Sequence, residues 1–198
     1  MKILSLSSDI KLFEEGSSVV SHQIKYGELA DRLDIVNLSL SSSHFKVKKP
    51  SDKVTIYPTN SIYKVFYFWD AYLLAKKLER PDLVTVQDPF ETGFTALLIA
   101  KYFKCPLQVQ IHTDFLSPYY FGESLKNKIR VLISKFVLPR ANCVRVVSER
   151  IKSSIQREMP SIKTPIAVLP IFVDTEKFGA EVARVDLHKN IPNLSSFY

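Results

Sequence analysis

Polar side chains stand at the ends of three apolar runs, where they could hold a hydroxyl or a phosphate. The run at residues 83–87 ends in Gln87 and is followed by Asp88. The run at residues 107–111 is followed by His112, Thr113 and Asp114, and the run at residues 143–147 by Ser148 and Glu149. A neutral imidazole can donate or accept a hydrogen bond near pH 7, so His112 suits a hydroxyl-bearing or phosphate-bearing ligand. The alternative is that strands simply end in polar loops, and the residue types alone leave both readings open.

A small-residue turn, Gly16-Ser17-Ser18, precedes an expected helix. Such a turn lets a phosphate approach the free backbone N–H groups at the N-terminus of a helix. The glycine pattern G-x-G-x-x-G of dinucleotide-binding proteins is absent from this stretch. An ordinary helix start is therefore the alternative for Gly16 and Ser17.

The elements that must position these residues alternate along the chain. Strands are predicted at residues 3–7, 35–40, 54–57, 83–87, 107–111, 143–147 and 166–169, and helices at 17–33, 61–79, 93–103, 124–138 and 148–158. Residues 41–52 are predicted to form a loop, and Ser61 to cap the helix that follows it. This alternation predicts an α/β fold, a Rossmann-like three-layer sandwich with a mostly parallel sheet. Ligands of such sheets bind at the carboxyl ends of the strands.

Two stretches could meet a surface partner. Residues 124–138 form an amphipathic pattern with one apolar face and basic residues off it, and Lys126, Arg130 and Lys135 are the candidate contacts with an anionic membrane. The alternative is a helix that packs its apolar face on the sheet. Residues 63–72 carry many aromatic side chains, which indicate either core or an exposed acceptor or membrane patch.

Composition bounds the possible partners. The chain has 198 residues, a net charge of +7 and two cysteines, Cys105 and Cys143, which form no metal-binding pattern. The charge favours anionic partners, but no nucleic-acid-binding motif accompanies it, so nucleic acid is not expected. We expect no metal site. The first residues lack the apolar run of a signal peptide, and the expectation is a cytoplasmic protein, with peripheral contact to the inner face of the membrane left open.

Four segments together resemble the family-four retaining glycosyltransferases. They are residues 80–93 (RPDLVTVQDPFETG), 109–114 (VQIHTD), 141–149 (ANCVRVVSE) and 168–178 (VLPIFVDTEKF), in the order that the family has them. The sequence departs from the family pattern in two places. Ser17 stands where the family usually has a second glycine, and Ile171-Phe172 replaces its Asn-Gly.

The resemblance implies one lobe of a GT-B fold. Residues 1–178 would be the acceptor-side Rossmann-like domain, and residues 179–198 an interdomain linker or truncated tail. Gly16 and Ser17 would face the donor diphosphate, His112 would lie near the transferred sugar, and Ser148 and Glu149 would line the cleft. Asp88, Thr113 and Asp114 are the further candidate substrate-binding residues at the strand ends.

The function implied is sugar transfer from a nucleotide-diphosphate sugar to an acceptor, with retained configuration. Lipid-linked and polysaccharide acceptors are both open, and no cofactor is expected besides the donor substrate. The donor-binding lobe, with the family's paired glutamates, is expected outside this sequence and is a required partner. The alternative function is a non-catalytic Rossmann-like module that docks on an anionic membrane or a partner.

Overall fold

A computed structural model describes residues 1–171 of the chain. The strands are β1 (Lys2–Ser7), β2 (Arg32–Asn37), β3 (Lys48–Ser51), β4 (Val54–Pro58), β5 (Leu83–Val86), β6 (Leu107–Ile111), β7 (Cys143–Val146) and β8 (Ile166–Val168). The helices are α1 (Ser18–Glu28), α2 (Tyr67–Ala75), α3 (Glu91–Phe103), α4 (Pro118–Glu123), α5 (Leu125–Val137) and α6 (Glu149–Glu158). Short 3-10 turns lie at η1 (Ile10–Leu12), η2 (Ser41–Ser43), η3 (Lys64–Phe66) and η4 (Leu138–Arg140). The predicted linker, residues 179–198, lies outside the described residues.

The eight strands form one sheet in the order β3-β4-β2-β1-β5-β6-β7-β8. Every pairing is parallel except that of β3 with β4. The chain builds outward from β1 in one direction through β2 and β4, and in the other through β5, β6 and β7. The strand order therefore reverses between β1 and β5, the place where open α/β sheets bind ligands. The predicted α/β fold with a mostly parallel sheet is confirmed.

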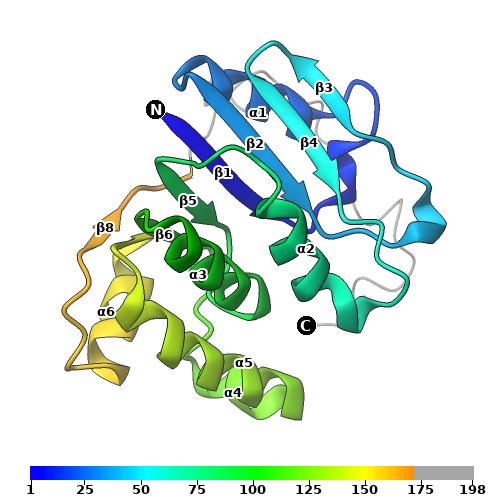
Figure 1. Cartoon of the computed structure of the whole chain (residues 1–198). Helices are drawn as coiled ribbons and strands as arrows, with labels where there is room; N and C mark the ends of the chain where they lie inside the picture. The colour runs from blue at the N-terminus through cyan, green and yellow to red at the C-terminus, as the bar shows by residue number, and fades with distance from the viewer. Residues whose placement is uncertain (172–198) are drawn as a thin grey trace, which may run out of the picture.

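Helices cover the two faces of the sheet unequally. Figure 1 shows α2, α3 and α5 on the near side, and the main core lies beneath them, with buried residues from these helices, from α6 and from β1 and β5–β7. The core on the other face is small and gathers Leu12, Leu33, Ile35, Val54 and Ile56 near α1. The three layers are present, but in the described part of the chain α1 is the helix of the thinner outer layer.

The structure differs from the prediction in three ways beyond shifts of element ends. Residues 41–52 contain β3, an antiparallel edge strand that a Ser- and Lys-rich sequence did not suggest. Ser61 does not cap a helix, because it is buried and bridges Leu40, and the helix begins only at Tyr67. The short helix α4 was not predicted. It starts at Pro118 behind the Ser117 cap, and six residues are too few to show a helical period.

Candidate active site

The parallel strands bring the predicted site segments to one edge of the sheet. β5 pairs with β6 through Thr85 and Gln108, and β6 pairs with β7 through Gln108 and Cys143, all in the same direction. The loops after β5, β6 and β7, which carry Asp88, His112 and Ser148, therefore leave the sheet at the same carboxyl edge. The strands place these residues where the sequence pattern predicted.

A polar network crosses the sheet on the α1 side. Nη1 of Arg145 donates to Oε1 of Gln110 at 2.9 Å, and Nε2 of Gln110 lies 3.1 Å from Oγ1 of Thr85. That hydroxyl donates to Oε1 of Gln108 at 3.1 Å. Because side chains alternate along β6, Gln108, Gln110 and His112 share this face, while Leu107, Val109 and Ile111 enter the core.

His112 lies at one end of a groove of about 710 Å³ on this face. Gln87 and Arg145 line the same groove, and His22 of α1 faces it from the other side. The groove continues along the strands as far as Met1, so only its end near Gln87 and His112 reaches the carboxyl edge. This end is the candidate site, because it combines a groove with the polar side chains of several strands.

The imidazole of His112 is held in its neutral form at neutral pH. The side chain of His112 is exposed by surface area, but its partial desolvation, and then the positive charge of Arg145, lower its pKa below the ordinary value of 6.5. Both effects disfavour the charged imidazolium. A neutral imidazole retains one donor and one acceptor nitrogen, which suits a sugar hydroxyl.

Asp88 holds the loop before α3 together. Its carboxylate accepts hydrogen bonds from the backbone N–H of Phe90, at 2.9 Å, and from the hydroxyl of Thr92. Burial raises the pKa of Asp88 against the opposing effect of these hydrogen bonds. Gly93 is needed beside it, because a Cβ there would lie 2.7 Å from the backbone oxygen of Asp88. In this structure Asp88 ties the loop after β5 to the first turn of α3 through Phe90 and Thr92.

Thr113 and Asp114 continue from His112 into the loop before α4. Thr113 is exposed, and its carbonyl accepts a hydrogen bond from the N–H of Phe115 at 2.9 Å. Oδ2 of Asp114 lies 4.0 Å from Nε of Arg150, at the start of α6. Its other oxygen, Oδ1, is buried and has no hydrogen-bond partner among the described residues. Asp114 therefore retains an acceptor close to His112 in sequence.

The remaining predicted cleft residues stand at helix N-termini. Oγ of Ser148 accepts from the N–H of Ile151 at 3.4 Å and caps α6, next to the exposed Glu149. Oγ of Ser17 accepts from the N–H of Val19 at 3.2 Å and caps α1. Gly16 has φ +68°, which favours glycine, and a Cβ there would meet nothing within 4 Å. Both turns are helix starts with open space around at least Gly16.

The three residues of α5 predicted to contact a membrane lie apart from this groove and differ among themselves. Lys126 and Lys135 are exposed. Arg130 is half-buried, with its Nε 3.0 Å from the Glu91 carboxylate and its guanidinium over the Phe90 ring. Arg130 therefore joins α5 to α3 and is not a free surface cation.

Arg145 and the glutamine network were not among the residues predicted for the site. The signal was available in residues 107–112, where apolar and polar side chains alternate in a strand expected to be buried on both faces. That alternation predicts one polar face, and Arg145 continues it on β7.

Two further features are absent from residues 1–171. No group of three or more His, Cys, Asp or Glu side chains there could hold a metal ion. No helix in that part of the chain is long and apolar enough to cross a bilayer.

Known structures share this fold. Sucrose-phosphate synthase from Thermosynechococcus elongatus aligns with a TM-score of 0.62 at 14% identity, over 90% of this chain and 93% of that chain. Anabaena HepE, solved with UDP and glucose, aligns with a TM-score of 0.56 at 15% identity, over 96% of this chain and 49% of that chain. UDP-GlcNAc 2-epimerase from Neisseria meningitidis, bound to UDP-GlcNAc, aligns with a TM-score of 0.53 at 17% identity, over 100% and 54%. The chain thus spans about half of the last two proteins.

Sequence comparison gives the family. No curated protein matches significantly over the chain. Residues 30–177 match the profile of Glycosyltransferase Family 4, which is most of the sequence and includes the strands that carry Asp88, His112 and Ser148. The chain therefore belongs to Glycosyltransferase Family 4.

Proposed function

We propose that this chain is the acceptor-side domain of an enzyme that transfers a sugar from a nucleotide-diphosphate sugar to an acceptor, with retention of configuration. The transfer would take place at the carboxyl edge of the sheet, beside the loop that follows β6. Family membership supports the general class of reaction. The donor, the stereochemical course and the acceptor are the parts that we add.

The position and charge state of His112 carry the proposal. His112 directly follows the last residue of β6 and borders a groove, and partial burial and the charge of Arg145 lower its pKa, which favours the neutral ring. A neutral imidazole can hydrogen-bond a hydroxyl of the transferred sugar without the cost of desolvating a charge. We assign His112 contact with that sugar, and Asp114 a place in the same loop, where it faces Arg150 of α6.

Nucleotide sugars are the proposed donors because proteins of similar fold bind them. HepE was solved with UDP and glucose, and the Neisseria epimerase with UDP-GlcNAc. The departing diphosphate of such a donor needs electrostatic stabilisation. Gly16 and Ser17 are the proposed contacts from this chain, because the backbone at the start of α1 is open there.

A second lobe completes the enzyme in this proposal. The chain spans about half of HepE and of the epimerase, which leaves room in proteins of this fold for another domain. That lobe would hold the nucleotide. We assign no metal or cofactor to the transfer, and expect a metal chelator to leave its rate unchanged.

The test is an assay of sugar transfer with a panel of nucleotide sugars, using the two-lobed protein that contains this domain. The proposal predicts a product whose anomeric configuration, read by NMR, equals that of the donor. An inverted product would reject retention, and no transfer with any donor and acceptor pair would reject the enzyme. Residues 1–198 alone should give no transfer, and measurable turnover by them would reject the second lobe.

A further inference from the structure

Helix α5 turns an apolar stripe toward solvent. Leu125 is 73% exposed, Ile129 50%, Leu132 66% and Phe136 42%. These four residues recur at helical spacing and form one side of the helix. The sequence pattern left open whether this stripe packs on the sheet or meets a surface partner.

The opposite side of the same helix packs against the rest of the domain. Asn127, Val131, Ser134 and Val137 are buried there, and Arg130 pairs with Glu91 of α3. The helix is therefore anchored without its most apolar residues. The exposed stripe needs another explanation, since contiguous apolar surface on a folded domain usually marks a binding face.

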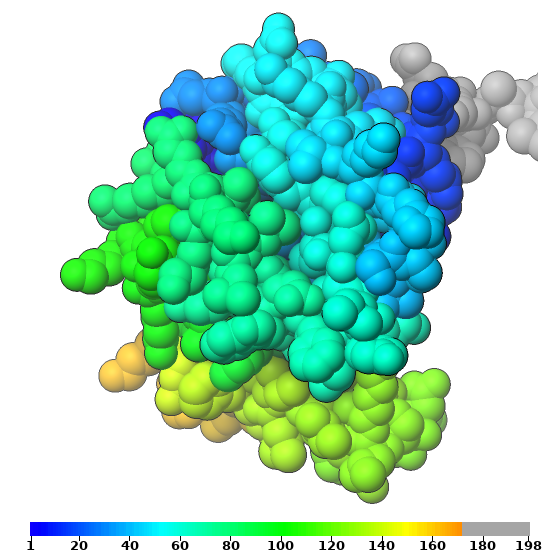
Figure 2. Space-filling view, turned by 45° about the vertical axis from the view of Figure 1, so that its right-hand side comes forward, coloured from blue at the N-terminus to red at the C-terminus, as the bar shows by residue number. Residues whose placement is uncertain are grey.

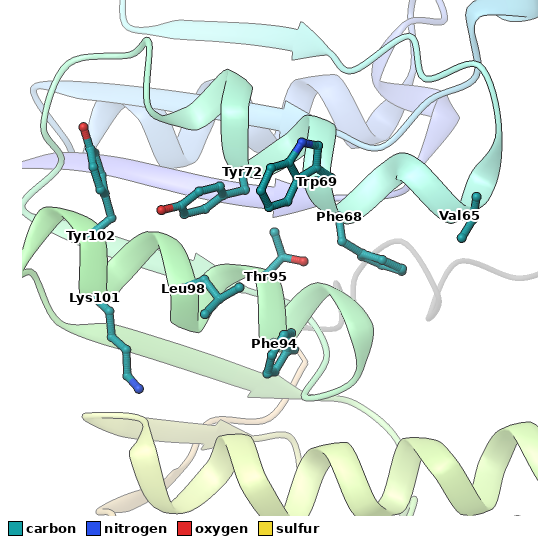
Figure 3. A pocket seen from close by; sticks show the side chains of 9 residues that line it. All are labelled: Val65, Phe68, Trp69, Tyr72, Phe94, Thr95, Leu98, Lys101 and Tyr102. Atoms are coloured by element: carbon teal, nitrogen blue, oxygen red, sulfur yellow. The ribbon is translucent and has the colours of Figure 1, made fainter.

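The stripe is continuous with an aromatic groove between α2 and α3. The rings of Phe94 and Phe136 lie 6.0 Å apart and join α3 to α5. The groove, about 760 Å³, is lined by Val65, Phe68, Trp69, Tyr72, Phe94, Thr95, Leu98, Lys101 and Tyr102 (Figure 3). Figure 2 shows the α2 and α5 segments reaching the surface of one face of the molecule. We call the stripe and the groove together the apolar face.

Basic side chains border the apolar face. Lys128 lies over the ring of Phe121 at 5.6 Å, and the guanidinium of Arg140 lies 3.8 Å from the centre of Phe136. Lys126 and Lys135 flank the stripe, and α5 has no acidic residue. At the other end, Lys76 lies over the rings of Tyr72 and Tyr102. Three of the basic side chains on this border, Lys76, Lys128 and Arg140, thus lie over aromatic rings.

We propose that the apolar face is a docking surface for a bilayer that contains anionic lipids. Leucine, isoleucine and aromatic side chains of an interfacial helix enter the boundary between headgroups and acyl chains, and flanking lysines meet the lipid phosphates. Tryptophan and tyrosine favour that same boundary, because their rings are apolar with one polar end. The face has both features, and charge complementarity selects an anionic bilayer as its occupant.

This inference goes beyond the proposed function and does not rest on it. The loop from His112 to Ser117 connects β6 directly to α4, which adjoins α5. A domain docked through α5 would therefore hold the β6 loop near the lipid headgroups.

The single tryptophan of the chain, Trp69, reports on docking, since it is 62% exposed in the groove. We expect its emission to shift to shorter wavelength when the full chain meets vesicles of phosphatidylglycerol and phosphatidylcholine in equal amounts. Brominated acyl chains should quench it. Vesicles of phosphatidylcholine alone should bind much more weakly, and salt of about 1 M, where the Debye length is about 3 Å, should weaken binding to the anionic vesicles.

Charge reversal on the border distinguishes binding through the apolar face from attraction to the net positive charge of the protein. The double variant Lys128→Glu with Lys135→Glu should bind the anionic vesicles at least about tenfold more weakly, from about 1 kcal/mol per lysine near the surface. The double variant Lys11→Glu with Lys46→Glu makes the same change of charge. Lys11 precedes Leu12 of the small core, and Lys46 follows Phe45, which stacks on Phe13, so both lysines lie on the α1 side. That control should bind nearly normally.

Three results would overturn the proposal. They are no binding to anionic vesicles, equal losses in both double variants, and binding without quenching of Trp69 by brominated lipid. Self-association of the chain that Leu132→Ser abolishes, without vesicle binding, would assign the face to a second copy instead. All four substituted lysines are exposed, so the thermal midpoints of the double variants should stay close to that of the unmodified chain.

Discussion

Among the polar residues at the strand ends, His112 differs in having hydrogen-bonding groups that are not used to hold a loop or helix end. The hydroxyls of Ser17 and Ser148 accept hydrogen bonds from N–H groups in the first turns of α1 and α6. The carboxylate of Asp88 accepts one from the N–H of Phe90, just before α3. His112 instead stands in a groove beside Arg145, with its ring neutral. At the scale of single residues, the candidate chemistry therefore centres on His112 and its neighbour Asp114.

The protonation of His112 should respond to Arg145. Substitution Arg145→Gln removes the second cause of the lowered pKa and should raise the pKa of His112 toward 6.5, although burial still acts. Imidazole NMR shifts followed against pH measure this directly. An unchanged pKa in the variant would show that the charge of Arg145 does not reach the ring.

The same shift makes stability depend on pH in a stated direction. Because the folded pKa of His112 lies below 6.5, the unfolded chain binds more protons between those two values. The contribution of His112 to stability is therefore complete above pH 6.5 and is lost as pH falls through the folded pKa. In His112→Asn, unfolding measured at several pH values should lose this part of the slope, and an identical slope would contradict the lowered pKa.

Gly93 should resist substitution. Gly93→Ala puts a Cβ 2.7 Å from the backbone oxygen of Asp88, and the shift needed should cost about 1–3 kcal/mol of unfolding free energy. Gly122→Ala in α4 is the matched control, because its Cβ would meet nothing within 4 Å and alanine favours a helix. Denaturant unfolding of both variants decides, and equal stabilities would contradict the tight contact.

Among the elements, α5 is one whose existence could be predicted from the sequence but whose orientation could not. Residues 124–138 were predicted as a helix, and Ser124 indeed caps α5. Its orientation could not be predicted, because two sides of the helix are apolar enough to face the core. Packing with α3, through Val131, Val137 and the Arg130–Glu91 pair, decides between them. A helical period identifies a stripe but not what the stripe meets.

The orientation of α5 is open to a direct test with neighbouring residues. Val131 is buried and Leu132 is exposed. Val131→Ala should lower the free energy of unfolding by about 2 kcal/mol, whereas Leu132→Ala should change it by less than about 0.5 kcal/mol. The reverse order of the two losses would mean that the helix faces the other way.

Substitutions of Ser148 at the N-terminus of α6 distinguish a structural role of this serine from a substrate-binding role. Ser148→Ala removes the cap and should cost about 1 kcal/mol of stability, while Ser148→Asn keeps a capping oxygen and should cost much less. Thermal unfolding of both variants measures the cap. If Ser148→Asn preserves stability but sugar transfer falls, the hydroxyl also binds substrate, and if neither variant loses stability the cap is not significant.

At the scale of the whole molecule, the sheet is predictable and the coverage of its faces is not. Alternating runs such as residues 107–111 and 143–147 identify parallel strands, and their common direction brings His112 and Ser148 to one edge. The polar side chains of β6 and Arg145 of β7 depend on a face that α1 borders only across a groove, which the sequence does not reveal. Edge strand β3 escaped prediction because its Lys and Ser residues look like a loop.

Turnover of the two-lobed enzyme after His112→Ala tests the central claim most directly, with the thermal midpoint measured on the same protein. The account predicts a turnover number roughly ten- to a thousandfold lower with a nearly unchanged midpoint, as for loss of one positioned polar group. His44→Asn is the control, since His44 lies in a loop at φ +50°, which asparagine tolerates, and should be fully active. A large drop in midpoint with near-normal turnover of the folded protein would contradict the account and make His112 a structural residue.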